Sequence, residues 1–105
     1  MQNKLKVITG EIIGDDVLLS IRELSVAYHV HAEFIIELVE YGLLEPQGDE
    51  PSTWQFDQEA LRRLQIATRL QRDFDLDISG LGLVLDLLDE IQTLRNRVNV
   101  LERIS

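Results

Sequence analysis

The chain of 105 residues contains no cysteine and no long apolar run. The first absence excludes disulfide bridges, thiolate metal ligands and a cysteine nucleophile, and it fits a reducing compartment. The apolar-rich window 81–91 is interrupted by Asp86, Asp89 and Glu90, so it is too short and too charged to span a bilayer. The N-terminal stretch MQNKLKVITG lacks the apolar core of a signal peptide. These features predict a cytoplasmic protein without a membrane segment.

The signatures of catalysis are missing as well. No phosphate-binding G-x-x-x-x-G-K-[ST], no G-x-G-x-x-G opening a helix and no G-x-S-x-G occurs. His29 and His31 have no third metal ligand nearby. The acidic run that begins at Asp73 lacks the glycine and glutamate of a calcium loop, because Ile78 and Val84 occupy those places. We therefore expect no enzyme, no cofactor, no metal site and no small-molecule substrate.

Positive charge is absent from residues 31–60, which hold eight acidic residues and no lysine or arginine. The whole chain carries a net charge of −9. Such a chain repels phosphate backbones and acidic membranes and attracts basic surfaces. Glu33, Glu37 and Glu40 follow helical spacing and form one acidic face, which is either a solvated surface or a binding surface for a basic partner.

Capping signals and apolar spacing predict the elements of a helix-turn-helix with a wing. Ser20 and Glu23 form a capping box before a helix of about two turns. A second helix spans roughly 32–41 and ends at Gly42. Residues 5–19 suggest one or two short strands, and the aromatic alternation of 53–56 suggests a wing strand. Asp57 is a good N-cap for a helix to about residue 72, and Asp77 or Ser79 can cap the last helix.

The last helix has a heptad pattern from Val84 onward. We expect its apolar stripe to form a homodimer through Leu87, Ile91, Leu94, Val98 and Leu101. A second face, Leu81, Leu85 and Leu88, should cover the core of the domain. The pairing of Glu90 and Arg97 with Arg95 and Glu102 leaves parallel and antiparallel arrangements open, and a helix folded back on its own domain is the alternative. The fold class is thus mainly α, with a winged helix-turn-helix domain at 1–80 and a leucine-rich coiled-coil-type helix at 81–105.

This arrangement resembles the MerR-type transcription regulators. The matching segments are Gly42-Leu43-Leu44-Glu45-Pro46 and Phe56-Asp57-Gln58-Glu59-Ala60-Leu61. Members of that class usually carry Arg-Tyr-Tyr-Glu-Arg before the Gly-Leu, where this chain has Ile36-Glu37-Leu38-Val39-Glu40. Trp54 stands where the wing arginine usually lies. Because phosphate contacts supply most non-specific DNA affinity, these replacements argue against DNA binding by this chain.

Two further motifs are similar to those of the CbpM family of chaperone modulators, and the resemblance extends from about Ser20 to Ile104. They are Thr53-Trp54-Gln55-Phe56-Asp57 and Leu76-Asp77-Ile78-Ser79-Gly80. The resemblance implies binding to the J-domain of CbpA, a DnaJ-like co-chaperone, and inhibition of its stimulation of Hsp70. A J-domain presents a positively charged helix, which the acidic face would complement.

The predicted partner-binding residues are Glu33, Glu37, Glu40, Tyr41 and Trp54. Trp54 can alternatively pack on the core or on the wing. Phe56 should lie in the core, because its alternation partner points to the other face of the strand. Two other functions remain open. One is DNA regulation of the MerR type through Arg22, Arg62, Arg63 and Arg69, and the other is an adaptor for a different basic partner.

Overall fold

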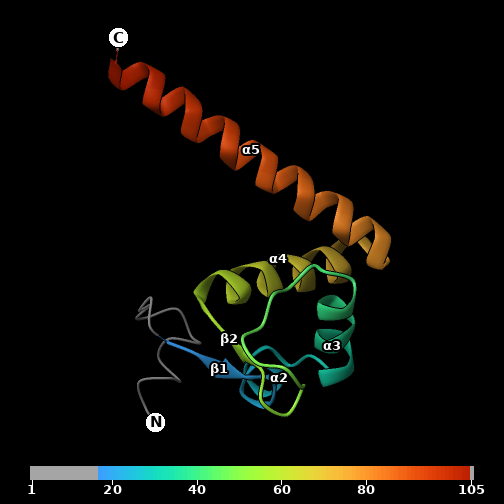
Figure 1. Ribbon diagram of the computed structural model, residues 1–105. Coiled ribbons are helices and arrows are strands. Elements are labelled where there is room, and N and C mark those ends of the chain that lie inside the picture. Colours follow the sequence, from blue (N-terminus) through green and yellow to red (C-terminus); the bar gives the residue numbers. More distant parts are fainter. Residues whose placement is uncertain (1–16, 105) are drawn as a thin grey trace.

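The computed structural model describes residues 17–104 and is mainly helical (Figure 1). Its elements in chain order are β1 (Leu19–Ser20), α2 (Ile21–Tyr28), α3 (Ala32–Glu40), β2 (Gln55–Phe56), α4 (Gln58–Phe74) and α5 (Ile78–Ile104). The predicted helix-turn-helix, wing and long last helix are all present. Of the strands expected within residues 5–19, those before Val17 lie outside the described residues.

Local capping fixes the starts of α2 and α4. The Ser20 hydroxyl accepts a hydrogen bond from the Glu23 amide, and the Ser20 amide donates to the Glu23 carboxylate, which completes the predicted capping box. A carboxylate oxygen of Asp57 accepts from the Ala60 amide at the start of α4. The left-handed conformations of His29 and Asp75 end α2 and α4.

A small antiparallel sheet joins the start of α2 to the start of α4. It belongs to the head, by which we mean residues 17–77, before α5 begins. β1 pairs with β2 in the register Leu19 to Phe56 and Ser20 to Gln55. Gln47 extends this pairing by two backbone hydrogen bonds with Gln55, so the loop 48–54 forms a wing. The sheet places Leu19 and Phe56, both fully buried, over the helices.

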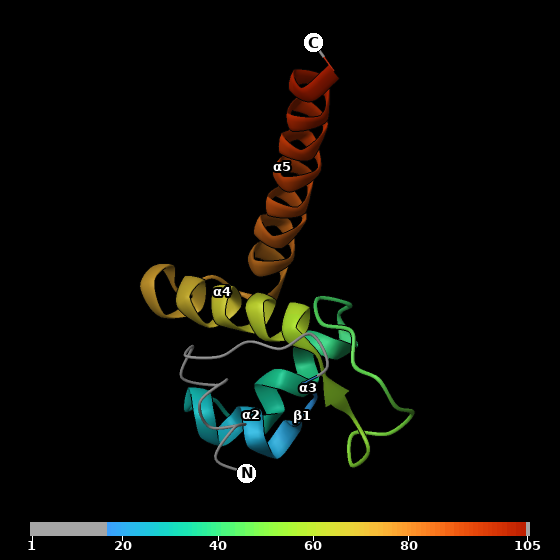
Figure 2. The same ribbon diagram turned by 90° about the vertical axis from the view of Figure 1, so that its left-hand side faces the viewer.

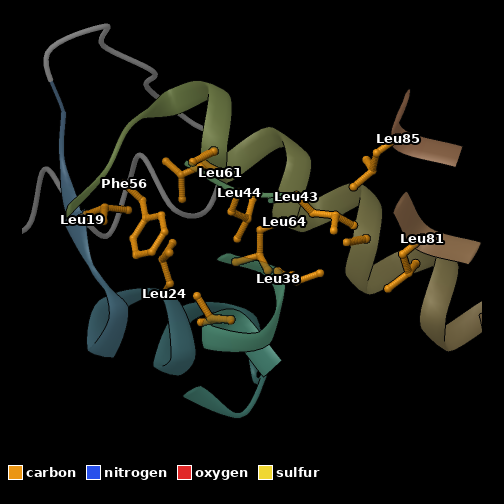
Figure 3. Close-up of a cluster of buried hydrophobic side chains, with 13 residues drawn as sticks. Leu19, Leu24, Leu38, Leu43, Leu44, Phe56, Leu61, Leu64, Leu81 and Leu85 are labelled. Carbon is orange, nitrogen blue, oxygen red and sulfur yellow. The ribbon is translucent and has the colours of Figure 1, made fainter. Parts of the chain in front are cut away.

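The core draws on every described element of the head and on the base of α5 (Figure 3). Phe56 is fully buried, as its alternation predicted, and lies beside Leu19 and Leu24 (Figure 3). The buried residues are Leu19, Leu24, Ile35, Leu38, Leu43, Leu44, Phe56, Ala60, Leu61, Leu64, Ala67, Leu81 and Leu85. Leu88, which we expected in this set, is 39% exposed because α5 has left the head by then.

From Asp86 to its end, α5 projects away from the head, and every residue of this half is exposed (Figures 1 and 2). The alternative of a helix folded back on its own domain is therefore wrong. The Asp77 carboxylate accepts from the Gly80 amide at the start of α5, as one of the two predicted caps. The division at residue 80 stays a prediction, and α5 runs across it. None of the helices within 17–104 has the length and apolar character needed to cross a membrane.

Candidate protein-binding site

The helix α3 separates its apolar and acidic residues onto opposite faces. Ile35 and Leu38 are fully buried against the core, and Phe34 and Val39 pack partly against it. Glu33, Glu37 and Glu40 are exposed. This separation follows from the 3.6-residue helical period, because residues three and four positions apart share a face.

A shallow depression on the acidic face is lined by His31, Glu33, Phe34, Glu37, Glu40 and Tyr41. Four of the five predicted partner-binding residues thus lie together. Tyr41 is 64% exposed, so its ring is accessible to a partner. Carboxylates beside aromatic rings suit a cationic side chain, whose charge pairs with the carboxylates and whose alkyl stem packs on the rings.

Tyr41 is held in place by the way α3 ends. Gly42 has a positive φ of 79°, its amide donates to the Val39 carbonyl, and the Leu43 amide donates to the Leu38 carbonyl at 2.8 Å. This is a Schellman ending, in which glycine avoids the steric cost of the left-handed conformation. The turn also buries Leu43 and Leu44, which fixes it to the core.

Trp54 does not join the depression. It is half-buried, packs against the core and meets Phe56 edge-on, with 6.2 Å between the ring centroids. Such an arrangement is favourable for two aromatic rings. Its predicted role as a binding anchor stays a prediction, and its packing on the wing strand is what the structure describes.

The three glutamates of the acidic face have no cationic partner among the described residues. Within residues 17–104 their side chains form no hydrogen bond and no ion pair. The arginines of α4 pair elsewhere: Arg62 with Glu59, Arg63 with Asp89, and Arg69 and Arg72 loosely with Asp73. The hydrogen bonds to Glu59 raise the pKa of Arg62. Among residues 17–104, the acidic face is therefore left without an internal counter-charge.

These pairings also bear on the DNA-binding alternative. Arg63 is engaged inside the molecule, since its side chain is 16% exposed and bonds to Leu43 and Asp89. Arg62 is held by two hydrogen bonds to Glu59. Of the four arginines considered for phosphate contacts, Arg63 is thus mostly withdrawn from solvent. The exposed surface of α3 offers carboxylates where a DNA reader needs cations.

The second predicted surface lies along the projecting half of α5. Leu87, Ile91, Leu94, Val98 and Leu101 are 43–65% exposed. Leu83 and Ile104 extend this apolar surface at its two ends. A contiguous apolar stripe of this kind marks a protein interface. Its pairing with a second copy of the chain stays a prediction.

Sequence reasoning missed two lining residues of the depression, His31 and Phe34. His31 is the exposed N-cap residue of α3 and makes no side-chain capping bond. Phe34 packs partly against the core and also lines the depression. Its spacing of three residues before Glu37 and seven before Tyr41 was the available signal, because these positions neighbour each other on a helix. Within residues 17–104, no group of three potential metal ligands comes together.

Comparisons with known proteins agree with this architecture. A model of the family described as "MerR HTH family regulatory protein" matches residues 19–103. A chaperone modulatory protein CbpM from Coxiella burnetii is 44% identical over 98 residues, which cover 93% of this chain and 92% of the relative. Proteins of the same name from Pseudomonas entomophila and Pseudomonas putida are 38% and 39% identical over 87 residues, or 83% of this chain and 86% of each relative.

Proposed function

Because this chain belongs to the CbpM family of chaperone modulatory proteins, we propose that it binds the J-domain of the DnaJ-like co-chaperone CbpA and blocks its stimulation of Hsp70. The family is regulatory and non-enzymatic. The acidic face of α3 is the proposed contact with the positively charged J-domain helix that Hsp70 also uses. Such a function would place the protein in the cytoplasm with its partner.

The observation that supports this proposal most is that Glu33, Glu37 and Glu40 have no cationic partner within residues 17–104. Three such carboxylates attract a basic helix at long range, which raises the association rate and selects the partner. Tyr41, exposed beside them, is the proposed anchor that supplies affinity on desolvation.

A charge reversal on α3 tests the proposal. The double substitution Glu37→Arg and Glu40→Arg should weaken binding to the isolated J-domain by about tenfold or more, because it replaces attraction by repulsion. Titration calorimetry measures the affinity, and the Hsp70 ATPase rate measures the loss of inhibition. Both side chains are exposed, so the fold should persist, as circular dichroism can check.

The matched control is Glu50→Arg with Asp86→Arg, which changes the net charge equally at exposed sites outside the depression. It should leave the affinity within about twofold of the unmodified chain. Equal losses in both variants would mean that net charge alone controls binding. An unchanged affinity in the α3 variant would remove this face from the function.

We further propose that the projecting half of α5 pairs with a second copy of the chain, through Leu87, Ile91, Leu94, Val98 and Leu101. The charges along the helix fit either orientation. A parallel pair matches Glu90 with Arg95 and Arg97 with Glu102, and an antiparallel pair matches Glu90 with Arg97 and Arg95 with Glu102.

A further inference from the structure

The Arg63 side chain connects three separate parts of the molecule. Its Nε donates to the Leu43 carbonyl at 2.8 Å, and its Nη1 donates to the two carboxylate oxygens of Asp89 at 2.9 and 2.7 Å. These partners lie 20 and 26 residues away in sequence. Because the side chain is only 16% exposed, its charge depends on these acceptors in place of water.

The two partners of Arg63 lie at the end of α3 and at the start of the exposed part of α5. The Leu43 carbonyl belongs to the turn that ends α3 and holds Tyr41 at the rim of the depression. Asp89 lies one turn beyond Leu85, the last buried residue of α5. The guanidinium therefore bonds both to the end of the acidic face and to the first exposed turns of the projecting helix.

We propose that Arg63 is a positioning residue that couples the acidic face of α3 to the direction of α5. When Arg63 and Asp89 are paired, α5 leaves the head at one fixed angle and the turn at Leu43 is held against α4. Without this ion pair, α5 is anchored through the apolar contacts at its base, among them those of Ile78, Leu81 and Leu85, and it pivots about them. The expected effect of Arg63 on J-domain binding rests on the proposed function, whereas its expected effect on the angle of α5 does not.

The surroundings of Arg63 make the ion pair separable from folding. A second depression, separate from the one on α3, is lined by Glu45, Asp57, Glu59, Arg63 and Asp89. Removal of the Asp89 charge leaves these carboxylates in the same depression, and the Arg63 Nε still donates to the Leu43 carbonyl, so the loss need not unfold the head. Asp89 itself is half-exposed, and its replacement opens no cavity in the core.

A distance measurement tests the angle. The chain has no cysteine, so Gln65→Cys on α4 and Asn99→Cys on α5, both exposed, give a unique pair of spin labels. An excess of unlabelled chain suppresses distances between copies. The parent pair should give one narrow distance distribution, and adding Asp89→Asn should broaden it or shift its mean by several ångströms.

The matched control is Asp86→Asn, on the same helix one turn earlier, because the Asp86 carboxylate has no partner within residues 17–104. It should leave the distribution unchanged. Arg63→Lys keeps the charge but cannot reach both acceptors with one planar fork, so it should resemble Asp89→Asn. A distribution for Asp89→Asn that superimposes on that of the parent would overturn the proposal, as would a broad distribution in the parent.

The coupling itself is read from J-domain affinity. Asp89→Asn should weaken binding about three- to tenfold although Asp89 lies outside the depression on α3, and Asp86→Asn should not. A changed angle with unchanged affinity would refute the coupling. If the unmodified chain fails to bind the J-domain, the proposed function fails, while the distances still decide whether Arg63 sets the angle of α5.

Discussion

The helices α3 and α5 leave opposite kinds of surface uncovered. α3 buries its apolar side chains and exposes carboxylates, whereas the projecting half of α5 exposes leucine, isoleucine and valine. Charged surface in water is stable without a partner, but a long apolar stripe gains free energy when covered. If both proposed surfaces bind partners, the difference predicts a lasting interaction along α5 and a reversible, charge-selected one at α3.

The largest expected effect is at α5. Leu94→Asp should weaken dimerisation by about 100-fold or more, because the carboxylate would be buried between two helices. Sedimentation velocity measures the change, with Asn96→Asp, on the outward side of the same helix, as the control. The J-domain affinity of each head should persist. If the unmodified chain sediments as a monomer, the proposed lasting interaction along α5 is wrong.

Salt should separate the two surfaces. Raising sodium chloride from about 0.05 M to about 0.5 M shortens the range of charge interactions severalfold, so J-domain binding should weaken about tenfold. Dimerisation through apolar side chains should change little over the same range. Calorimetry and sedimentation on the same preparations give both values. Equal salt sensitivity would show that the two surfaces do not differ in kind.

The two aromatic candidates, Tyr41 and Trp54, should divide between binding and stability. Tyr41→Ala should lower J-domain affinity by about tenfold at nearly unchanged thermal stability, because the ring is 64% exposed in the free protein. Trp54→Ala should lower the free energy of unfolding by about 1–3 kcal/mol, because the ring packs on Phe56 and the core. Calorimetry measures the J-domain affinity of each variant, and denaturant titration measures its free energy of unfolding. The opposite result would assign binding to Trp54 and stability to Tyr41.

The smallest effect concerns an acidic residue that has a structural role. Asp57→Ala should reduce stability by about 1 kcal/mol, because the Ala60 amide loses its capping acceptor. Glu37→Ala should leave the unfolding midpoint in urea unchanged, since this carboxylate has no partner within residues 17–104. A similar cost for both would mean that the α3 carboxylates stabilise the fold and are not reserved for binding.

Local sequence signals predicted the elements well. The capping box at Ser20, the cap at Asp57 and the glycine after α3 each act between residues a few positions apart, so their spacing is readable directly. The acidic face followed from helical periodicity. The aromatic alternation of residues 53–56 also predicted correctly that Phe56 is buried.

Long-range contacts were beyond the same reasoning. Nothing in the spacing indicates that Arg63 reaches Leu43 and Asp89, because these contacts depend on how α4 and α5 pack. The packing angle also decides that Leu85 is buried and Leu88 is not. For the same reason the depression on α3 excludes Trp54, whose place is set by the pairing of β2 with β1.

The length of α5 has a consequence for stoichiometry. Its 27 residues correspond to about 40 Å, so antiparallel copies would hold their heads at far ends of a rigid rod. One co-chaperone molecule would then be unable to occupy both heads. Each assembly would sequester two J-domains independently, and the fraction of silenced co-chaperone would rise in simple proportion to the amount of inhibitor made.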